Sequence, residues 1–172
     1  LRERGYEIKM GSGITADAIA ADVVDCDAIL ARTALFPADV IEAGKKLRVI
    51  GRAGIGVDNV DLSAATARGI IVMNTPEGNT ITTAEHAIAL MFALSRHVAF
   101  ADRCMRSGEW PKKGTTGVEL TGKTLGLLGL GRVATVLAKV GRALDMTVLV
   151  YDPYVSDARA AEFGAKKATL DE

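Results

Sequence analysis

Leu125-Gly-Leu-Leu-Gly-Leu-Gly-Arg-Val-Ala134 is an apolar run that ends in a glycine-rich turn, and Tyr151-Asp152-Pro153 follows it along the chain. The continuous apolar residues 125–130 predict a buried parallel strand, and apolar residues at helical spacing from Val133 predict a helix behind the turn. Residues 147–151 (TVLVY) are β-branched and apolar, which predicts a second buried strand. This order of strand, turn, helix and strand is typical of a dinucleotide-binding unit; an ordinary βαβ unit without a ligand is the alternative.

Each residue type in the turn has a chemical reason to be there. Gly129 lets the chain turn sharply from strand to helix, and Gly131 has no side chain to hold a pyrophosphate away from the backbone N–H groups. Ala134 stands where a third glycine is usual, and its small methyl group still lets the helix pack closely on the strand. The N-terminus of the helix offers N–H donors and a positive dipole end to phosphates. Asp152, 21 residues after Gly131, stands where a carboxylate accepts the ribose hydroxyl groups.

The composition limits the classes of protein to which this chain can belong. The chain has 172 residues, which is enough for one ordinary domain or two small ones, and 49% of them are apolar. Lys+Arg and Asp+Glu both number 21, so there is no basic footprint for nucleic acid. No apolar run is long enough to span a membrane, and no signal peptide opens the chain. Cys26 and Cys104 fit no metal or redox spacing. We therefore expect a cytoplasmic protein with no metal, no nucleic acid and no membrane as partners.

Helices and strands alternate along the chain, which is typical of a parallel α/β sheet. Before the boundary, the predicted strands are residues 6–10, 28–31, 47–51 and 70–73, and the predicted helices are residues 16–21, 37–45 and 61–68. The turn-rich segment 74–79 (NTPEGN) is the best boundary, so the expected domains are residues 1–79 and 80–172. Beyond it, a capping box at Thr82-Thr83-Ala84-Glu85 predicts the start of a long helix. A second helix over 100–107, a helix from Ser156 to Phe163, a strand over 165–169 and a new helix from Leu170 follow.

The two ends of the chain indicate a piece of a longer protein. Residues 1–5 (LRERG) look like the last turn of a helix with Gly5 as its stop, and the chain does not begin with Met. We expect that the chain opens inside a βα unit, without its first strand, and ends inside another.

Four runs of sequence carry a resemblance to a known family. They are GRAGIGVDNVD at residues 51–61, VMNTPEGNT at 72–80, TAEH at 83–86 and LGLGR at 128–132. In this order and spacing they resemble the D-2-hydroxyacid dehydrogenases, and the similarity covers nearly the whole chain. It implies an α/β fold with a flavodoxin-like substrate domain, its first strand missing, over residues 1–79. The first half of a Rossmann NAD-binding domain would follow over residues 80–172.

The resemblance assigns substrate contacts on the first domain. They are Arg32, Thr33, Gly54, Ile55, Gly56 and Asn79. Gly54, Ile55 and Gly56 match a loop whose N–H groups hold the substrate carboxylate, and glycines do let a backbone nest approach an anion. A plain strand-to-helix turn is the alternative. Arg32 and Thr33 match a basic contact to the far end of the substrate, for which arginine is suited; a solvated surface arginine is the alternative.

The resemblance also assigns the cofactor contacts and leaves the reacting groups outside the chain. The cofactor residues are Gly129, Gly131, Arg132, Val133 and Asp152, with NAD as the cofactor. Neither His86 nor His97 matches the catalytic histidine of the family. The arginine, glutamate and histidine of the family's reaction would follow Glu172, so we expect no catalytic residue here.

The implied function is the NAD-dependent oxidation of a small anionic D-2-hydroxy acid, with D-3-phosphoglycerate, the entrance to serine synthesis, as the favoured substrate. Reduction of glyoxylate or hydroxypyruvate and oxidation of formate, both known in the superfamily, stay open. A corepressor of the same fold, which senses NAD and binds peptides, is an alternative from another class. The resemblance also implies a homodimer through the region 82–110.

Overall fold

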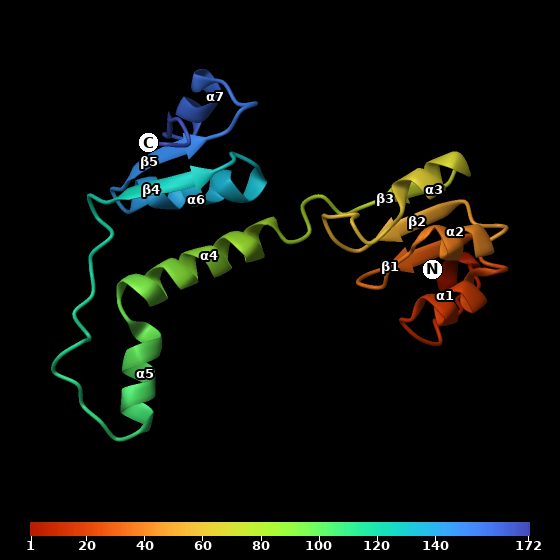
Figure 1. The fold of residues 1–172 in the computed structure, drawn as a ribbon, viewed down its shortest axis with the longest axis horizontal. Coiled ribbons are helices and arrows are strands. Elements are labelled where there is room, and N and C mark those ends of the chain that lie inside the picture. The colour runs from red at the N-terminus through yellow and green to blue at the C-terminus, as the bar shows by residue number, and fades with distance from the viewer. The chain divides into compact units, whose positions relative to one another are not determined.

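Two parallel three-stranded sheets organise this chain (Figure 1). The computed structural model describes all 172 residues, which divide into the units Leu1–Asn79 and Thr80–Glu172. Parallel pairing joins every pair of neighbouring strands, and a helix lies between successive strands of each sheet. The predicted α/β class with parallel sheets is therefore confirmed.

The first unit has the strand order β1-β2-β3. Its strands are β1 (Ala28–Ala31), β2 (Val49–Arg52) and β3 (Ile71–Met73), and its helices are α1 (Ala16–Val23), α2 (Ala38–Ala43) and α3 (Leu62–Ala67), after a 3-10 turn at Arg2–Arg4. In the register, Ala31 pairs with Arg52 and Gly51 pairs with Met73. The carboxyl ends of all three strands thus meet at one edge of the sheet.

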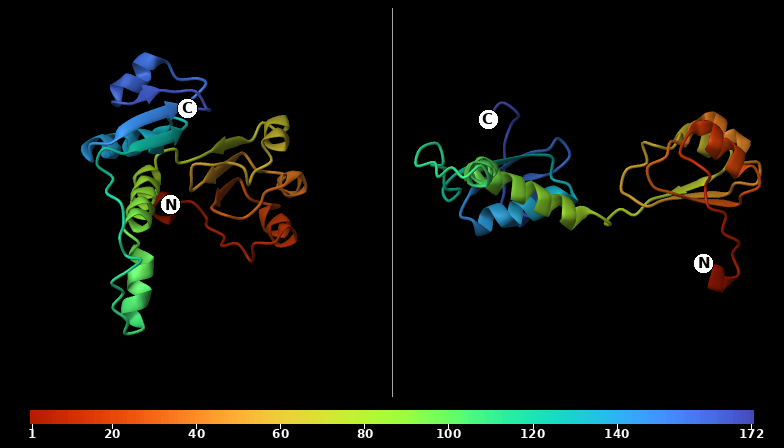
Figure 2. Two further views of the ribbon diagram at one scale, coloured as in Figure 1. Left: turned by 60° about the vertical axis from the view of Figure 1, so that its left-hand side comes forward. Right: turned by 90° about the horizontal axis from the view of Figure 1, so that it is seen from below.

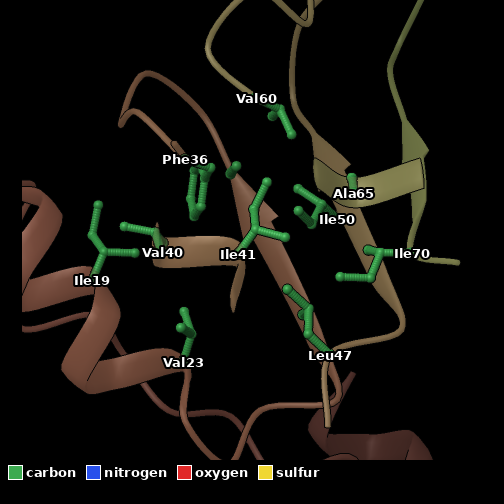
Figure 3. Close-up of a cluster of buried hydrophobic side chains, with 11 residues drawn as sticks. Ile19, Val23, Phe36, Val40, Ile41, Leu47, Ile50, Val60, Ala65 and Ile70 are labelled. Carbon is green, nitrogen blue, oxygen red and sulfur yellow. The ribbon is translucent and has the colours of Figure 1, made fainter. Parts of the chain in front are cut away.

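The three helices of the first unit cover a single face of its sheet (Figure 2). Val40 and Ile41 of α2 are fully buried against Ile50 of β2, within a cluster that all three helices join (Figure 3). The strands alternate in burial, and Leu30 and Ile71 on the opposite face are 78% and 62% exposed. That sheet face is therefore apolar and uncovered in this structure.

Residues 6–10 form no strand, so that prediction is wrong. Their composition suits a strand, but a strand needs a partner for its backbone groups. In the flavodoxin-like order 2-1-3-4-5, the second strand pairs only with the first. No strand in the described residues runs beside them, and they stay irregular. The predicted stop at Gly5 is confirmed, because this glycine is left-handed with φ 83° and its N–H donates to the Arg2 carbonyl.

The second unit has the strand order β4-β5-β6, which corresponds to strands 1, 2 and 3 of a dinucleotide-binding sheet. Its elements are α4 (Thr80–Ser95), α5 (Val98–Arg106), β4 (Thr124–Leu128), α6 (Arg132–Ala143), β5 (Thr147–Tyr151), α7 (Asp157–Glu162) and β6 (Lys166–Lys167). The two long strands pair in register, with Leu127 beside Val150. They bury these side chains with Ala138 of α6 and Ala160 of α7.

Gly141 of α6 lies close to the side chains of β4 and β5. A β-carbon on Gly141 would lie 2.8 Å from Leu125 Cδ2 and 3.2 Å from Val148 Cγ2. Ala134, at the usual third-glycine position, is half-buried and packs at the border of the same cluster. Close helix packing therefore depends on a glycine two turns further along the helix than the motif predicts.

Local signals placed several helix starts correctly. The helix predicted over 100–107 begins two residues earlier, at Val98, and two other predictions are wrong. The side chains of Asp61 and Ser156 accept from the N–H groups of Ala64 and Arg159, as their positions predict. The capping box is wrong, because α4 already begins at Thr80 and Thr82 lies inside it. No helix begins at Leu170 either: residues 170–172 are irregular, and the Glu172 carboxylate accepts from the Thr169 N–H.

Candidate functional site

The loop that follows β2 lies at the carboxyl edge of the first sheet, where parallel α/β sheets bind ligands. Its start is held by backbone bonds, since the Ala53 N–H donates to the Ala31 carbonyl at 2.8 Å. Two of its carbonyl groups are also occupied. The Thr75 N–H donates to the Gly54 carbonyl at 2.9 Å, and Asn74 Nδ2 donates to the Ile55 carbonyl at 2.7 Å.

Two N–H groups of the same loop are available to a ligand, whereas the Gly54 N–H donates to the Arg52 carbonyl at 3.0 Å. Those of Ile55 and Gly56 have no acceptor within the chain. Consecutive N–H groups without partners form a nest, a backbone concavity that favours an anion. The loop thus has the donors that a substrate carboxylate requires.

Arg52 brings a positive charge to this loop, and the sequence interpretation missed it. Its guanidinium occupies the space where a β-carbon on Gly54 would lie, and its Nε donates to the Arg32 carbonyl at 3.1 Å. No carboxylate pairs with Arg52, so its charge is not neutralised within the chain. A basic residue that closes an apolar strand just before a glycine loop is the signal that could have found it.

Gly56 also gives room to a polar group. A β-carbon there would overlap the carboxylate of Asp58, which is exposed. Asn59 holds the far end of the loop: it is 7% exposed and its Nδ2 donates to the Ala34 carbonyl at 2.7 Å. The backbone reinforces this link, because the Phe36 N–H donates to the Asn59 carbonyl. The loops after β1 and β2 are therefore fastened to each other.

The side chains of the remaining predicted substrate residues make no hydrogen bond to the loop. Arg32 and Thr33 are exposed directly after β1 and line a groove of about 310 Å³ together with Lys9. None of the residues of the nest lines that groove. Asn79 is exposed at the end of the unit and has no hydrogen bond to the loop. The structure joins Arg32 to the loop through its backbone carbonyl only.

The glycine turn of the second unit contains Gly129 and Gly131, and the two glycines differ in what the fold requires of them. Gly129 has φ 89°, a left-handed conformation that side chains disfavour, and its N–H donates to the Tyr151 carbonyl at 2.7 Å. Gly131 has an ordinary φ of −76°, and a β-carbon there would meet no atom of the chain within 4 Å. The fold requires glycine at 129 but not at 131. An open surface at Gly131 suits the close approach of a ligand.

The N-terminus of α6 is open in the same way. Gly131 is its N-cap and supplies no side-chain acceptor, and the N–H groups of Val133 and Ala134 have no partner within the chain. Unpaired donors at the start of a 12-residue helix favour a phosphate, through direct hydrogen bonds and the helix dipole. The residues at this turn therefore fit the pyrophosphate of a dinucleotide.

Asp152 lies at the end of β5 and reaches back to the turn. Its Oδ2 accepts from the Leu130 N–H at 2.8 Å, and its Oδ1 accepts from the Tyr154 N–H at 2.8 Å. These two N–H groups, Leu130 first, hold the pKa of Asp152 below its ordinary value. The half-buried carboxylate is thus charged at neutral pH and already braces the turn beside the open N-terminus of α6.

The two histidines and the possible metal ligands of the chain do not come together in a further site. His86 is exposed on α4, and His97, with φ 53°, is the N-cap of α5. No group of three or more His, Cys, Asp or Glu side chains is placed to hold a metal ion. No helix combines the length and the apolar character that a membrane crossing requires.

The fold and the features of the two units indicate a class of protein. The second unit has the strand, glycine turn, helix and strand that are typical of a dinucleotide-binding unit, and the first has a loop with two unpartnered N–H groups at its strand ends. Residues 1–170 match the family described as D-isomer specific 2-hydroxyacid dehydrogenase, catalytic domain, and the chain belongs to this family of oxidoreductases. The resemblance seen in the sequence is therefore confirmed.

Individual relatives support the same family assignment. The chain is 48% identical over 172 residues to D-3-phosphoglycerate dehydrogenase of Archaeoglobus fulgidus, covering 99% of this chain and 33% of that protein. A crystal structure of a protein from Thermus thermophilus matches with TM-score 0.88 and 31% identity over 99% of this chain and 55% of that one. A Polaromonas protein, described as a putative NAD-binding D-isomer specific 2-hydroxyacid dehydrogenase, matches with TM-score 0.79 and 29% identity over 90% of this chain and 50% of that one. The chain thus spans about a third of the length of its curated relatives.

Proposed function

We propose that this chain is part of a longer NAD-dependent dehydrogenase that oxidises D-3-phosphoglycerate in serine synthesis. The 48% identity to a D-3-phosphoglycerate dehydrogenase supports the substrate. The observation that carries the proposal is the loop after β2, where two N–H groups without partners lie beside the unpaired charge of Arg52. Such a loop suits a small substrate with a carboxylate and further negative charge.

The first unit acts as the substrate domain in this proposal. The N–H groups of Ile55 and Gly56 bind the substrate carboxylate. Gly54, whose own N–H donates to the Arg52 carbonyl, leaves space for the Arg52 guanidinium, which adds positive charge at the same place. Arg32 and Thr33 contact the phosphate end, since arginine recognises phosphate well. Asn79 adds a polar contact from the end of the domain. The proton of the substrate hydroxyl passes to a histidine outside this chain.

The second unit acts as the cofactor domain. When bound, NAD would supply the acceptor for the hydride of the substrate C2. Gly129 and Gly131 would leave room for its pyrophosphate, Arg132 and Val133 would contact the pyrophosphate, and Asp152 would accept hydrogen bonds from the ribose hydroxyl groups. The charge of Asp152 also repels the 2′-phosphate of NADP. The NAD-binding relative from Polaromonas supports this choice of cofactor.

We further propose a cytoplasmic homodimer that uses the region 82–110. Large apolar side chains on this region are exposed in the isolated chain, among them Leu90, Phe92, Leu94, Met105 and Trp110. An interface between two copies would remove these apolar side chains from water.

The test is NADH formation by the complete protein that contains this chain. We expect turnover with D-3-phosphoglycerate and NAD, and much slower turnover with formate, or with glyoxylate or hydroxypyruvate in the reverse direction. Faster reaction with one of those three would replace the proposed substrate. Absence of any turnover, together with NAD-dependent binding of peptides, would favour a corepressor of the same fold.

A further inference from the structure

Asn74 is the first residue after β3, and its side chain reaches a loop 19 positions earlier in the sequence. Its Nδ2 donates to the Ile55 carbonyl at 2.7 Å. The next residue, Thr75, donates its N–H to the Gly54 carbonyl at 2.9 Å. Both contacts lie within the first unit, where the register places the ends of β2 and β3 side by side.

These two contacts determine where the nest donors point. A peptide group is planar and trans, so its carbonyl and the N–H of the next residue point in opposite directions. When Thr75 holds the Gly54 carbonyl, it also orients the N–H of Ile55. When Asn74 holds the Ile55 carbonyl, it orients the N–H of Gly56. A hydrogen bond to the carbonyl also polarises its peptide group, which strengthens the N–H as a donor.

We propose that Asn74 is a positioning residue that aims the Gly56 N–H at the substrate carboxylate. The inference rests on the proposed function, because it takes a 2-hydroxy acid as the ligand of the nest. Asn74 contacts the loop at the Ile55 carbonyl, which points away from the Gly56 N–H. It therefore needs no contact with the substrate. A polar residue directly after the apolar strand 70–73 was visible in the sequence, but its partner was not.

The role proposed for Asn74 differs from a purely structural role, and Asn59 is an example of the structural role in the same chain. Asn59 is buried and joins two loops of the core edge. Asn74 is exposed and lies outside the buried cluster. Replacement of Asn74 is therefore expected to change the loop without unfolding the unit.

The test compares three variants of the complete protein. Asn74→Leu keeps the approximate size and removes the donor, and Asn74→Gln keeps an amide donor. Glu77→Ala is the control, because Glu77 is exposed in the same segment and has no hydrogen bond or ion pair. For Asn74→Leu we expect the KM for D-3-phosphoglycerate to rise about tenfold, the size of effect of one charge-assisted hydrogen bond. The Kd for NADH and the Tm should stay unchanged, Asn74→Gln should recover part of the loss, and Glu77→Ala should match wild type.

A second measurement, deuterium exchange, reports the order of the loop independently of the reaction. The N–H groups of Ala53 and Thr75 both donate hydrogen bonds at this loop, so their deuterium exchange reports its order. Uptake should rise in Asn74→Leu and stay at the wild-type level in Glu77→Ala. An unchanged KM or unchanged uptake in Asn74→Leu would overturn the inference. If the wild-type protein does not oxidise D-3-phosphoglycerate, the proposed function fails, and the exchange measurement alone decides whether Asn74 orients the loop.

Discussion

Asp152 shows how one side chain serves the turn and the ligand at once. It accepts from the Leu130 N–H before any cofactor is present, which explains why the pKa of its carboxyl is lowered. Asp152→Ala removes this acceptor together with the ribose contact, so it should loosen the turn. Asp152→Asn removes the charge and keeps one of the two oxygen acceptors, so it keeps one of the bonds to the Leu130 and Tyr154 N–H groups.

We therefore expect the two substitutions to differ in the complete protein. Asp152→Asn should weaken NAD binding about tenfold, because a charge-assisted hydrogen bond becomes a neutral one, and should lower the Tm by less than Asp152→Ala, because one oxygen acceptor is kept. Asp152→Ala should lower the Tm as well, and with a basic residue in place of Tyr151 or Pro153 it should relax the preference for NAD over NADP. Fluorescence titration with NADH and NADPH measures the preference. If the wild-type protein already uses both cofactors equally, Asp152 does not hold the ribose.

At the scale of elements, the packing of α6 on β4 and β5 rests on Gly141. Overpacking at a tight contact costs about 1–3 kcal/mol, and alanine regains about 1 kcal/mol of helix propensity. Gly141→Ala should therefore lower the free energy of unfolding by about 1 kcal/mol, measured by denaturant titration. Gly126→Ala is the matched control, since a β-carbon on Gly126 would meet nothing within 4 Å. Equal stability of the two variants would show that α6 can shift away without cost.

At the scale of the whole molecule, the isolated 172-residue chain is expected to lack dehydrogenase activity. In the order 3-2-1-4-5-6 a dinucleotide lies across strands 1 and 4, and the second unit supplies strands 1 to 3 as β4, β5 and β6. Leu128 at the open edge of β4 is 81% exposed, and such an edge favours pairing with a second copy. We expect no NADH formation from D-3-phosphoglycerate and NAD under conditions in which the complete protein is active. Turnover near the rate of the complete protein would mean that the reacting residues lie within this chain.

The sequence by itself determined the features that depend on local composition. Apolar runs predicted β1 and β5 with their observed bounds, and Asp61 and Ser156 predicted the helix starts that they cap. Gly129 predicted a sharp turn from strand to helix, and its φ of 89° agrees. The site residues carried over from the family remain proposals. Only the tertiary structure decided that residues 6–10 are not a strand and that Arg52 lies over Gly54. It alone showed that Asn74 holds Ile55 and that Asp152 holds Leu130. The physical reason is the same in each case: a strand partner, a shared volume or a hydrogen bond between residues 19 or 22 positions apart exists only once the chain has folded.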